Sequence, residues 1–183
     1  MKKSEKLALL GEATGSYTLL RCGFRYNSYA VYYYIQAVSD RFLYAAAEDD
    51  FILDGFCVEK LSALRSVRPV DNLIVQINRE RELLKQLHAP TLVLDSWQTV
   101  LRSLAALDCF VILEQLEPAE EEAFWLGKIQ SVGASSVRFL AFDGDGVWQS
   151  VEDIPFRRIS RITFGSRYAT VWQDYLEVKT AQG

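Results

Sequence analysis

The sequence has few residues of the types that build active sites. Its single histidine is His88, and its three cysteines, Cys22, Cys57 and Cys109, form no Cys-x-x-Cys pair. One histidine with unpaired cysteines excludes a histidine-rich metal site, and we expect no histidine-based catalytic triad. A glycine-rich phosphate loop of the G-x-x-x-x-G-K type is also missing. We therefore expect a protein that is not an enzyme and that binds neither a cofactor nor a metal.

The chain also lacks a long uninterrupted apolar run. Lys2 and Lys3 are followed only by the short apolar stretch 7–10 before Gly11, which is too short for a signal peptide. No later run reaches the roughly 20 apolar residues that a membrane-spanning helix needs. An odd number of unpaired cysteines suits a reducing compartment. These features predict a cytoplasmic protein.

An excess of positive charge is absent as well. The 183 residues carry a formal net charge of −4, with 12 Lys/Arg against 11 Asp/Glu in residues 1–90 and 8 against 13 in residues 91–183. An acidic protein gains little non-specific affinity for phosphate backbones, so nucleic-acid binding would require a local basic patch. Half of the residues are hydrophobic and 13% are aromatic, which favours a folded chain.

Two parts of the chain repeat one pattern of apolar residues. The first extends from Tyr34 to Val67, and the second from Lys128 to Ile162. Ile35 corresponds to residue 129 and Leu64 to residue 159, so the offset changes from 94 to 95 and one residue is inserted between these positions. Such self-similarity predicts two related domains, residues 1–90 and 91–183. We also expect Cys22 and Cys109 to be small core residues of equivalent strands.

Alternation of apolar and polar residues predicts short strands in both halves. The predicted strands cover residues 29–36, 41–45, 51–58, 64–67, 109–116, 124–132, 137–142, 147–154 and 159–164, with a tight turn at 143–146. Apolar residues at helical spacing predict helices over 4–13, 72–88, 96–107 and from 166 onward. Asp71 and Asp95 are the expected N-caps of the two central helices. These two helices are expected to form a hairpin that joins the repeats.

Two segments of the second repeat resemble Sm-like (LSM) proteins. Leu126–Val132 is similar to their second strand, where a glycine precedes alternating apolar residues and the strand bends. Ile154–Ile162 is similar to their fourth strand, tight turn and fifth strand. The resemblance implies a mainly β fold with flanking helices, built as two small closed Sm-like, SH3-type barrels in tandem. It also implies subunit rings and binding of single-stranded RNA.

The chain departs from the Sm-like pattern at the positions that bind RNA in that family. The family's loop between strands 2 and 3 follows an Asp-x-x-x-Asn pattern, whereas residues 133–136 and 39–41 here contain no asparagine. The family's Arg-Gly turn is replaced by Arg157-Arg158 in one repeat and by Ser62-Ala63 in the other. We therefore expect the Sm-like fold but place RNA binding second.

Arginines near the predicted strand 4–5 turns, together with tyrosines of the predicted strand 29–36, are the candidate contacts with a nucleic acid or a partner. The candidates are Arg157, Arg158, Arg161, Arg167, Arg65, Arg68, Tyr32 and Tyr34. Arginines bind phosphates and tyrosines stack on unpaired bases, although solvated surface charge and strand packing explain the same residues.

Three functions remain open on the sequence. The first is a binding or assembly module that recruits a protein partner, and the second is an Sm-like protein that binds single-stranded RNA. A weaker alternative is an immunity or antitoxin-like factor. We expect a monomer or a dimer rather than a ring, because Pro155 removes a ladder donor and the acidic segment 117–122 repels a second copy.

Overall fold

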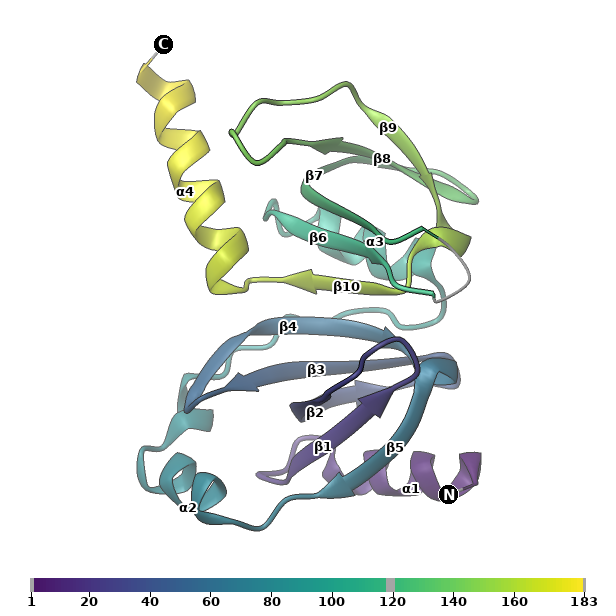
Figure 1. Ribbon diagram of the computed structural model, residues 1–183, viewed down its shortest axis with the longest axis vertical. Coiled ribbons are helices and arrows are strands. Elements are labelled where there is room, and N and C mark those ends of the chain that lie inside the picture. The colour runs from purple at the N-terminus through teal and green to yellow at the C-terminus, as the bar shows by residue number, and fades with distance from the viewer. Residues whose placement is uncertain (1, 118–120, 183) are drawn as a thin grey trace. The chain divides into compact units, whose positions relative to one another are not determined.

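The chain folds into two compact units, Met1–Pro90 (unit 1) and Thr91–Gly183 (unit 2), each with five antiparallel strands (Figure 1). The computed structural model describes residues 2–117 and 121–182, and side chains up to residue 178. Unit 1 contains α1 (Lys3–Ala13), β1 (Leu19–Phe24), β2 (Ala30–Val38), β3 (Phe42–Asp49), β4 (Ile52–Lys60), the 3₁₀-helix η1 (Leu61–Ala63), β5 (Leu64–Pro69), α2 (Leu73–Glu80) and the 3₁₀-helix η2 (Leu83–Gln86). Unit 2 contains α3 (Trp97–Ala105), β6 (Val111–Gln115), β7 (Ala123–Val132), β8 (Ser136–Ala141), β9 (Glu152–Pro155), the 3₁₀-helix η3 (Phe156–Arg158), β10 (Arg161–Phe164) and α4 (Arg167–Gln182).

Both units arrange their strands in the same order. The hydrogen-bonded order is β5-β1-β2-β3-β4 in unit 1 and β10-β6-β7-β8-β9 in unit 2. In each unit a helix precedes the first strand, and a 3₁₀-helix joins the fourth strand to the fifth. The prediction of a mainly β chain with flanking helices is confirmed. Within the described residues, the fourth and fifth strands of a unit form no ladder with each other, so neither sheet is closed. Our expectation of closed barrels was therefore wrong.

The long second strand of each unit bends at the same place in the repeat. The pairing of β2 with β3 shifts between Ile35 and Ala37, and that of β7 with β8 shifts between Ile129 and Ser131. In both strands the extra residue of this β-bulge is a glutamine that follows the repeated isoleucine. A bulge increases the local twist, so each second strand curls over its own core.

Strand register locates the inserted residue and corrects one expected equivalence. Leu43 of β3 and Val137 of β8 are equivalent, because each pairs with the repeated valine of its second strand. On the fourth strands, Leu43 pairs with Glu59 and Val137 pairs with Ile154. The offset is therefore 94 in the third strand and 95 in the fourth, which places the insertion between β8 and β9. Cys22 lies opposite Val67, and Leu113 holds the corresponding place opposite Ile162. Our pairing of Cys22 with Cys109 was wrong, because Cys109 precedes β6 and is only partly buried.

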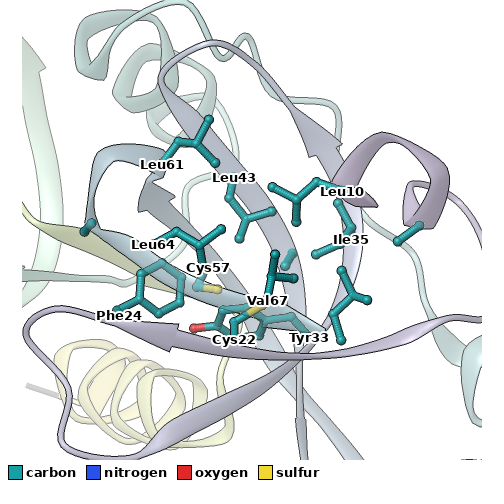
Figure 2. Packing of buried hydrophobic residues seen from close by; sticks show 14 residues of the cluster. Leu10, Cys22, Phe24, Tyr33, Ile35, Leu43, Cys57, Leu61, Leu64 and Val67 are labelled. Atoms are coloured by element: carbon teal, nitrogen blue, oxygen red, sulfur yellow. The ribbon is translucent and has the colours of Figure 1, made fainter. Parts of the chain in front are cut away.

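Buried residues on one face of the unit 1 sheet, including residues of β1 and β2, form the hydrophobic core of this unit (Figure 2). Leu20, Cys22 and Phe24 alternate on β1 and point into this core, where Leu10 of α1 covers them. The carboxylate of Glu59 is also fully buried and accepts hydrogen bonds from the hydroxyls of two tyrosines, Tyr26 and Tyr33. Burial raises the pKa of the Cys22 thiol to about 12, and the nearby Glu59 adds to the shift.

Helix α2 covers part of the opposite face of the unit 1 sheet. Val75 of α2 packs on Leu19, Tyr34 and Ala46, which all lie on that face. The side-chain amide of Asn78 bonds to the Tyr34 hydroxyl at 3.3 Å. Because both faces of the sheet are covered here, tyrosines on either face become core residues.

The core of unit 2 lies between its sheet and two helices. On one side, α4 buries Ala169 and Leu176 against residues of β6 and β7, including Ile112 and Leu126. On the other side, α3 packs on β7 and β8 with four buried side chains. These four are Trp97, Val100, Leu101 and Leu104. The indole N–H of Trp97 donates to the carbonyl of Ile159 at 3.1 Å, which ties α3 to the turn before β10.

The two central helices differ from the prediction in their caps, length and packing. Each begins one residue later than expected, with Asn72 and Ser96 as N-caps instead of the preceding aspartates. Helix α2 ends at Glu80, because Glu82 adopts left-handed backbone angles with φ of 52°. Each helix packs on the sheet of its own unit, so our expectation of a shared helical hairpin was wrong.

The loop before β9 also differs from the prediction. Residues 147–151 do not extend the strand, although Phe142 and Trp148 form an isolated bridge that closes the expected turn. The Asp143 carboxylate accepts the N–H groups of Asp145 and Val147, each at 3.0 Å. The Trp148 ring then packs on the Phe142 ring, with 5.4 Å between centroids. Hydrogen bonds to Asp143 and ring packing therefore stabilise this loop, whereas we expected a continuous strand ladder here.

Candidate functional surfaces

The expected basic turn of unit 2 contains an arginine that is bound within its own unit. The Arg158 guanidinium lies over the Trp125 ring at 4.9 Å, and its Nε donates to Gln115 at 2.5 Å. A second nitrogen of Arg158 lies 3.6 Å from the carboxylate of Glu152, which also accepts the Trp125 indole N–H at 3.0 Å. Arg158 therefore joins η3 to β6, β7 and β9 through one hydrogen bond, one ring contact and one longer ion pair.

Arg161 is bound even more firmly by a carboxylate. Its Nε and a terminal nitrogen donate to the two carboxylate oxygens of Glu114, at 2.5 Å and 2.7 Å. The two residues are directly opposite each other on β10 and β6, with side chains 17% and 12% exposed. Such a bidentate pair is strong and directional, and a phosphate would have to compete with Glu114 for the same donors. The structure thus gives Arg158 and Arg161 structural contacts instead of open phosphate sites.

The other two candidate arginines of unit 2 lie at its surface. Arg157 is exposed within η3, and Arg167 is exposed as the first residue of α4. Exposed Glu152 and Asp153 of β9 precede Arg157 closely, so the local charge is mixed. The acidic segment 117–122 includes residues 118–120, which lie outside the described part of the chain.

Unit 1 presents a row of basic and aromatic side chains that is not neutralised in this way. Arg68 of β5 lies directly opposite Arg21 of β1, which in turn lies opposite Tyr32 of β2. Residues paired across strands share one face of a sheet, so the three side chains form a row. In residues 2–117 and 121–178, neither Arg21 nor Arg68 has a carboxylate within ion-pair distance. Two like charges facing each other repel, so an anion between them would stabilise the row.

Sequence reasoning singled out two members of this row, Arg68 and Tyr32, and missed Arg21. The signal was available, because Arg21 is the polar position in the alternation of Leu19–Phe24. Arg65 is exposed and lies at the bulge between β5 and β1, close to the row in the sequence.

Tyr34 does not belong to this surface. Its side chain is 2% exposed in the core under α2, and burial raises the pKa of its hydroxyl. Tyr34 cannot stack on a base in this fold, so our prediction that it contacts a nucleic acid or a partner was wrong.

A continuous apolar surface lies on α4 of unit 2. Four side chains of the helix are at least half exposed and are spaced by three, four and three residues: Tyr168 at 55%, Val171 at 62%, Tyr175 at 50% and Val178 at 54%. Phe124 of β7, 54% exposed, extends this set by packing its ring on Tyr168 with centroids 6.5 Å apart. We refer to these five side chains as the α4 apolar surface. Exposed apolar patches of this kind mark interaction sites more often than isolated exposed residues do.

Other chemistry-bearing residues do not gather into a site. Among the described residues, no three His, Cys, Asp or Glu side chains are placed to share a metal ion. His88 is exposed near the end of unit 1, and Cys22 and Cys57 are buried in its core. Burial raises the pKa of the Cys109 thiol as well. Within the same described ranges, no helix has both the length and the apolar composition needed to cross a membrane.

Comparison of the chain with protein-family models, with curated proteins and with solved structures found no significant match in any of the three.

Proposed function

We propose that this chain is a non-enzymatic binding and assembly module, built on two open Sm-like barrels in tandem, that recruits a protein partner. The observation that carries the proposal is the α4 apolar surface, where five large apolar side chains are about half exposed on one unit. A partner that covers them gains the hydrophobic free energy that the folded chain leaves unused. The three free thiols support a place in the cytoplasm.

The backbone supports the Sm-like part of the proposal. A helix, five strands in the order 5-1-2-3-4 and a 3₁₀-helix between strands 4 and 5 recur in both units, and the tight turn between the fourth and fifth strands agrees with the Sm-like resemblance of Ile154–Ile162. The second strands are long and bent, which is a further similarity. In unit 2, Gly127 stands in the bent strand with φ of 159°, and a Cβ atom there would lie 2.0 Å from the carbonyl oxygen of Leu140. A glycine at this position is therefore a requirement of the backbone.

Charge favours a protein partner over RNA. Unit 2 has the more acidic half of the sequence, and two of its candidate arginines are held by Glu114 and Glu152. A phosphate backbone approaching unit 2 would meet a net negative field, with Arg157 and Arg167 as the exposed candidate arginines. An apolar partner surface does not meet that barrier.

Single-stranded RNA is a second candidate ligand because of the Arg68–Arg21–Tyr32 row of unit 1. An arginine pair with an adjacent tyrosine offers phosphate contacts and one stacking face. Gel shift with U-rich and A-rich single strands, at two salt concentrations, tests this candidate with wild type and the variant R21Q/R68Q. A matched control is R102Q, which removes an exposed arginine of α3. Tight binding that weakens with salt and is lost in R21Q/R68Q alone would place RNA first.

A site-specific photocrosslinker tests the protein-partner proposal in living cells. p-Benzoylphenylalanine replaces Val171 in one strain and the adjacent Thr170 in another. Thr170 is exposed on the polar side of the same helical turn, so it is a matched control. We expect protein adducts at position 171 and few at position 170. Equal or absent crosslinking at both positions would remove the support that α4 gives to the proposal.

A further inference from the structure

Helix α4 is apolar on two neighbouring faces, of which its own unit covers only one. Ala169 and Leu176 are buried in unit 2, with Trp172 packed beside them. The other face carries the four exposed residues spaced by three, four and three positions, and we call them the α4 stripe. This spacing is that of positions a and d in a heptad, which forms the seam between two packed helices. The polar residues Thr170, Asp174 and Glu177 occupy the remaining side.

We propose that the α4 stripe packs antiparallel against the α4 stripe of a second copy of this chain, forming a two-fold symmetric dimer. The inference rests on the proposed function, because it names the protein partner of the α4 apolar surface. A two-fold interface requires a surface that is complementary to itself.

Side-chain volume supports this self-complementarity and sets the direction. In an antiparallel pair of helices, position a of one helix packs against position d of the other. Tyr168 then meets Val178 of the second copy, and Val171 meets Tyr175. Every layer combines one large and one small side chain, which fills the seam evenly. A parallel pair would instead place tyrosine against tyrosine and valine against valine. Antiparallel helix dipoles also attract each other.

The exposed area is sufficient for a weak dimer. An aromatic side chain buries about 200 Å² when fully covered, so the three half-exposed rings of the α4 apolar surface offer about 300 Å² and the two valines raise this to about 450 Å² per copy. A dimer would bury about 900 Å² in total, close to the lower limit of roughly 1,000 Å² for a specific interface. Because each helix is already fixed on a folded unit, little ordering accompanies association. We therefore expect a reversible dimer with a dissociation constant on the order of tens of micromolar.

The rim of the antiparallel seam carries one charge that reports on its direction. With the layers described above, the two-fold axis passes near position 173, so the exposed Asp174 of each copy lies beside the axis on the same side of the seam. The two carboxylates repel each other weakly across the rim. In a parallel pair they would lie on opposite sides of the seam.

Sedimentation equilibrium of the full chain from about 5 to 500 μM tests the dimer, with variants V171D, T170D and D174N. We expect wild type to dimerise, V171D to weaken dimerisation at least about 30-fold, and T170D to stay within about twofold of wild type. Since Val171 is 62% exposed, V171D should fold normally, which circular dichroism checks. D174N should tighten the dimer about two- to threefold at low salt, with the gain lost at high salt.

Several outcomes would overturn the proposal. A wild-type chain that is monomeric at 500 μM refutes the dimer, and so does a V171D dimer as stable as wild type. An unchanged D174N dimer refutes the antiparallel arrangement. If the chain is monomeric but position 171 crosslinks to a different protein, the proposed function stands and self-association fails. If position 171 crosslinks to nothing, both fail.

Discussion

Replacing Glu114 by glutamine removes the carboxylate that holds Arg161 between β6 and β10. If Arg161 has a structural role, as its two hydrogen bonds to Glu114 indicate, E114Q destabilises unit 2. If Arg161 were instead kept for a phosphate ligand, E114Q would release it and increase RNA affinity. The same substitution thus separates the two interpretations.

The cost of E114Q follows from the burial of the pair. Removing one partner of a fully buried ion pair costs about 3–5 kcal/mol, because the other charge stays buried without compensation. The side chains here are 17% and 12% exposed, so water reaches Arg161 partly and a cost of about 2–3 kcal/mol is expected. For a unit of this size, that loss lowers the melting temperature by roughly 10–15 °C.

Tryptophan fluorescence during urea unfolding measures this loss in unit 2 alone. The four tryptophans, at positions 97, 125, 148 and 172, all lie in unit 2, so their emission reports on that unit. The control is E177Q, which breaks an exposed pair with Lys128 and should cost less than about 0.5 kcal/mol.

The double variant E114M/R161M completes a thermodynamic cycle. It replaces both charges by apolar side chains, so it should be less destabilised than the two single changes added together, with a coupling of about 2 kcal/mol. An E114Q chain that unfolds like wild type, or a coupling near zero, would refute the structural role of Arg161.

Three further predictions concern the two cores. Gly127→Ala should prevent folding of unit 2, because the new Cβ meets the carbonyl oxygen of Leu140; a red-shifted tryptophan emission in buffer would show this, and a native spectrum would contradict it. Tyr33→Phe removes a buried hydrogen bond to Glu59 and should destabilise unit 1 by about 1.5–3 kcal/mol, read from far-UV circular dichroism, whereas exposed Tyr29→Phe should be neutral. The thiol pKa of Cys22 is about 12 in the folded chain, against a reference value of 9.0 for the unfolded chain, so the unfolded chain loses this proton at lower pH. The free energy of unfolding therefore keeps its full value below pH 9 and falls between pH 9 and pH 12, by up to about 1.4 kcal/mol for each pH unit. Wild type should therefore lose more stability than C22A over that range, and parallel curves would contradict the assignment.

Local sequence patterns predicted the helices and strands, whereas the contacts of the candidate site residues depend on pairing between strands that are distant in the sequence. The repeat at Ile35 and Ile129 reappears as two bulges in equivalent places, because bending is encoded within one strand. Arg161 was expected to be an open contact, but its partner Glu114 lies 47 residues away, and only the register of β6 with β10 brings them together.

Burial of Tyr34 depended on a second element in the same way. Alternation along β2 predicts two faces, but it does not reveal that α2 covers the face that carries Tyr34. The apolar spacing of α4 was visible in the sequence from Tyr168 to Tyr175, whereas the division of that helix into a covered and an exposed face required the packed unit.

The glutamine bulges restrict where this chain can gain or lose residues. Beyond Gln130, the side chains of β7 return to the faces that β8 requires only because one unpaired residue has been inserted. Deleting Gln130 would shift the phase of the rest of β7, so that Ser131 and Val132 exchange faces, and the same holds for Gln36 in β2. A loop has no alternation of side chains between two faces, so an added or deleted residue there does not change which side chains face the core. The one residue by which the two repeated segments, 34–67 and 128–162, differ in length lies between β8 and β9, where an extra residue turns no side chain away from the core.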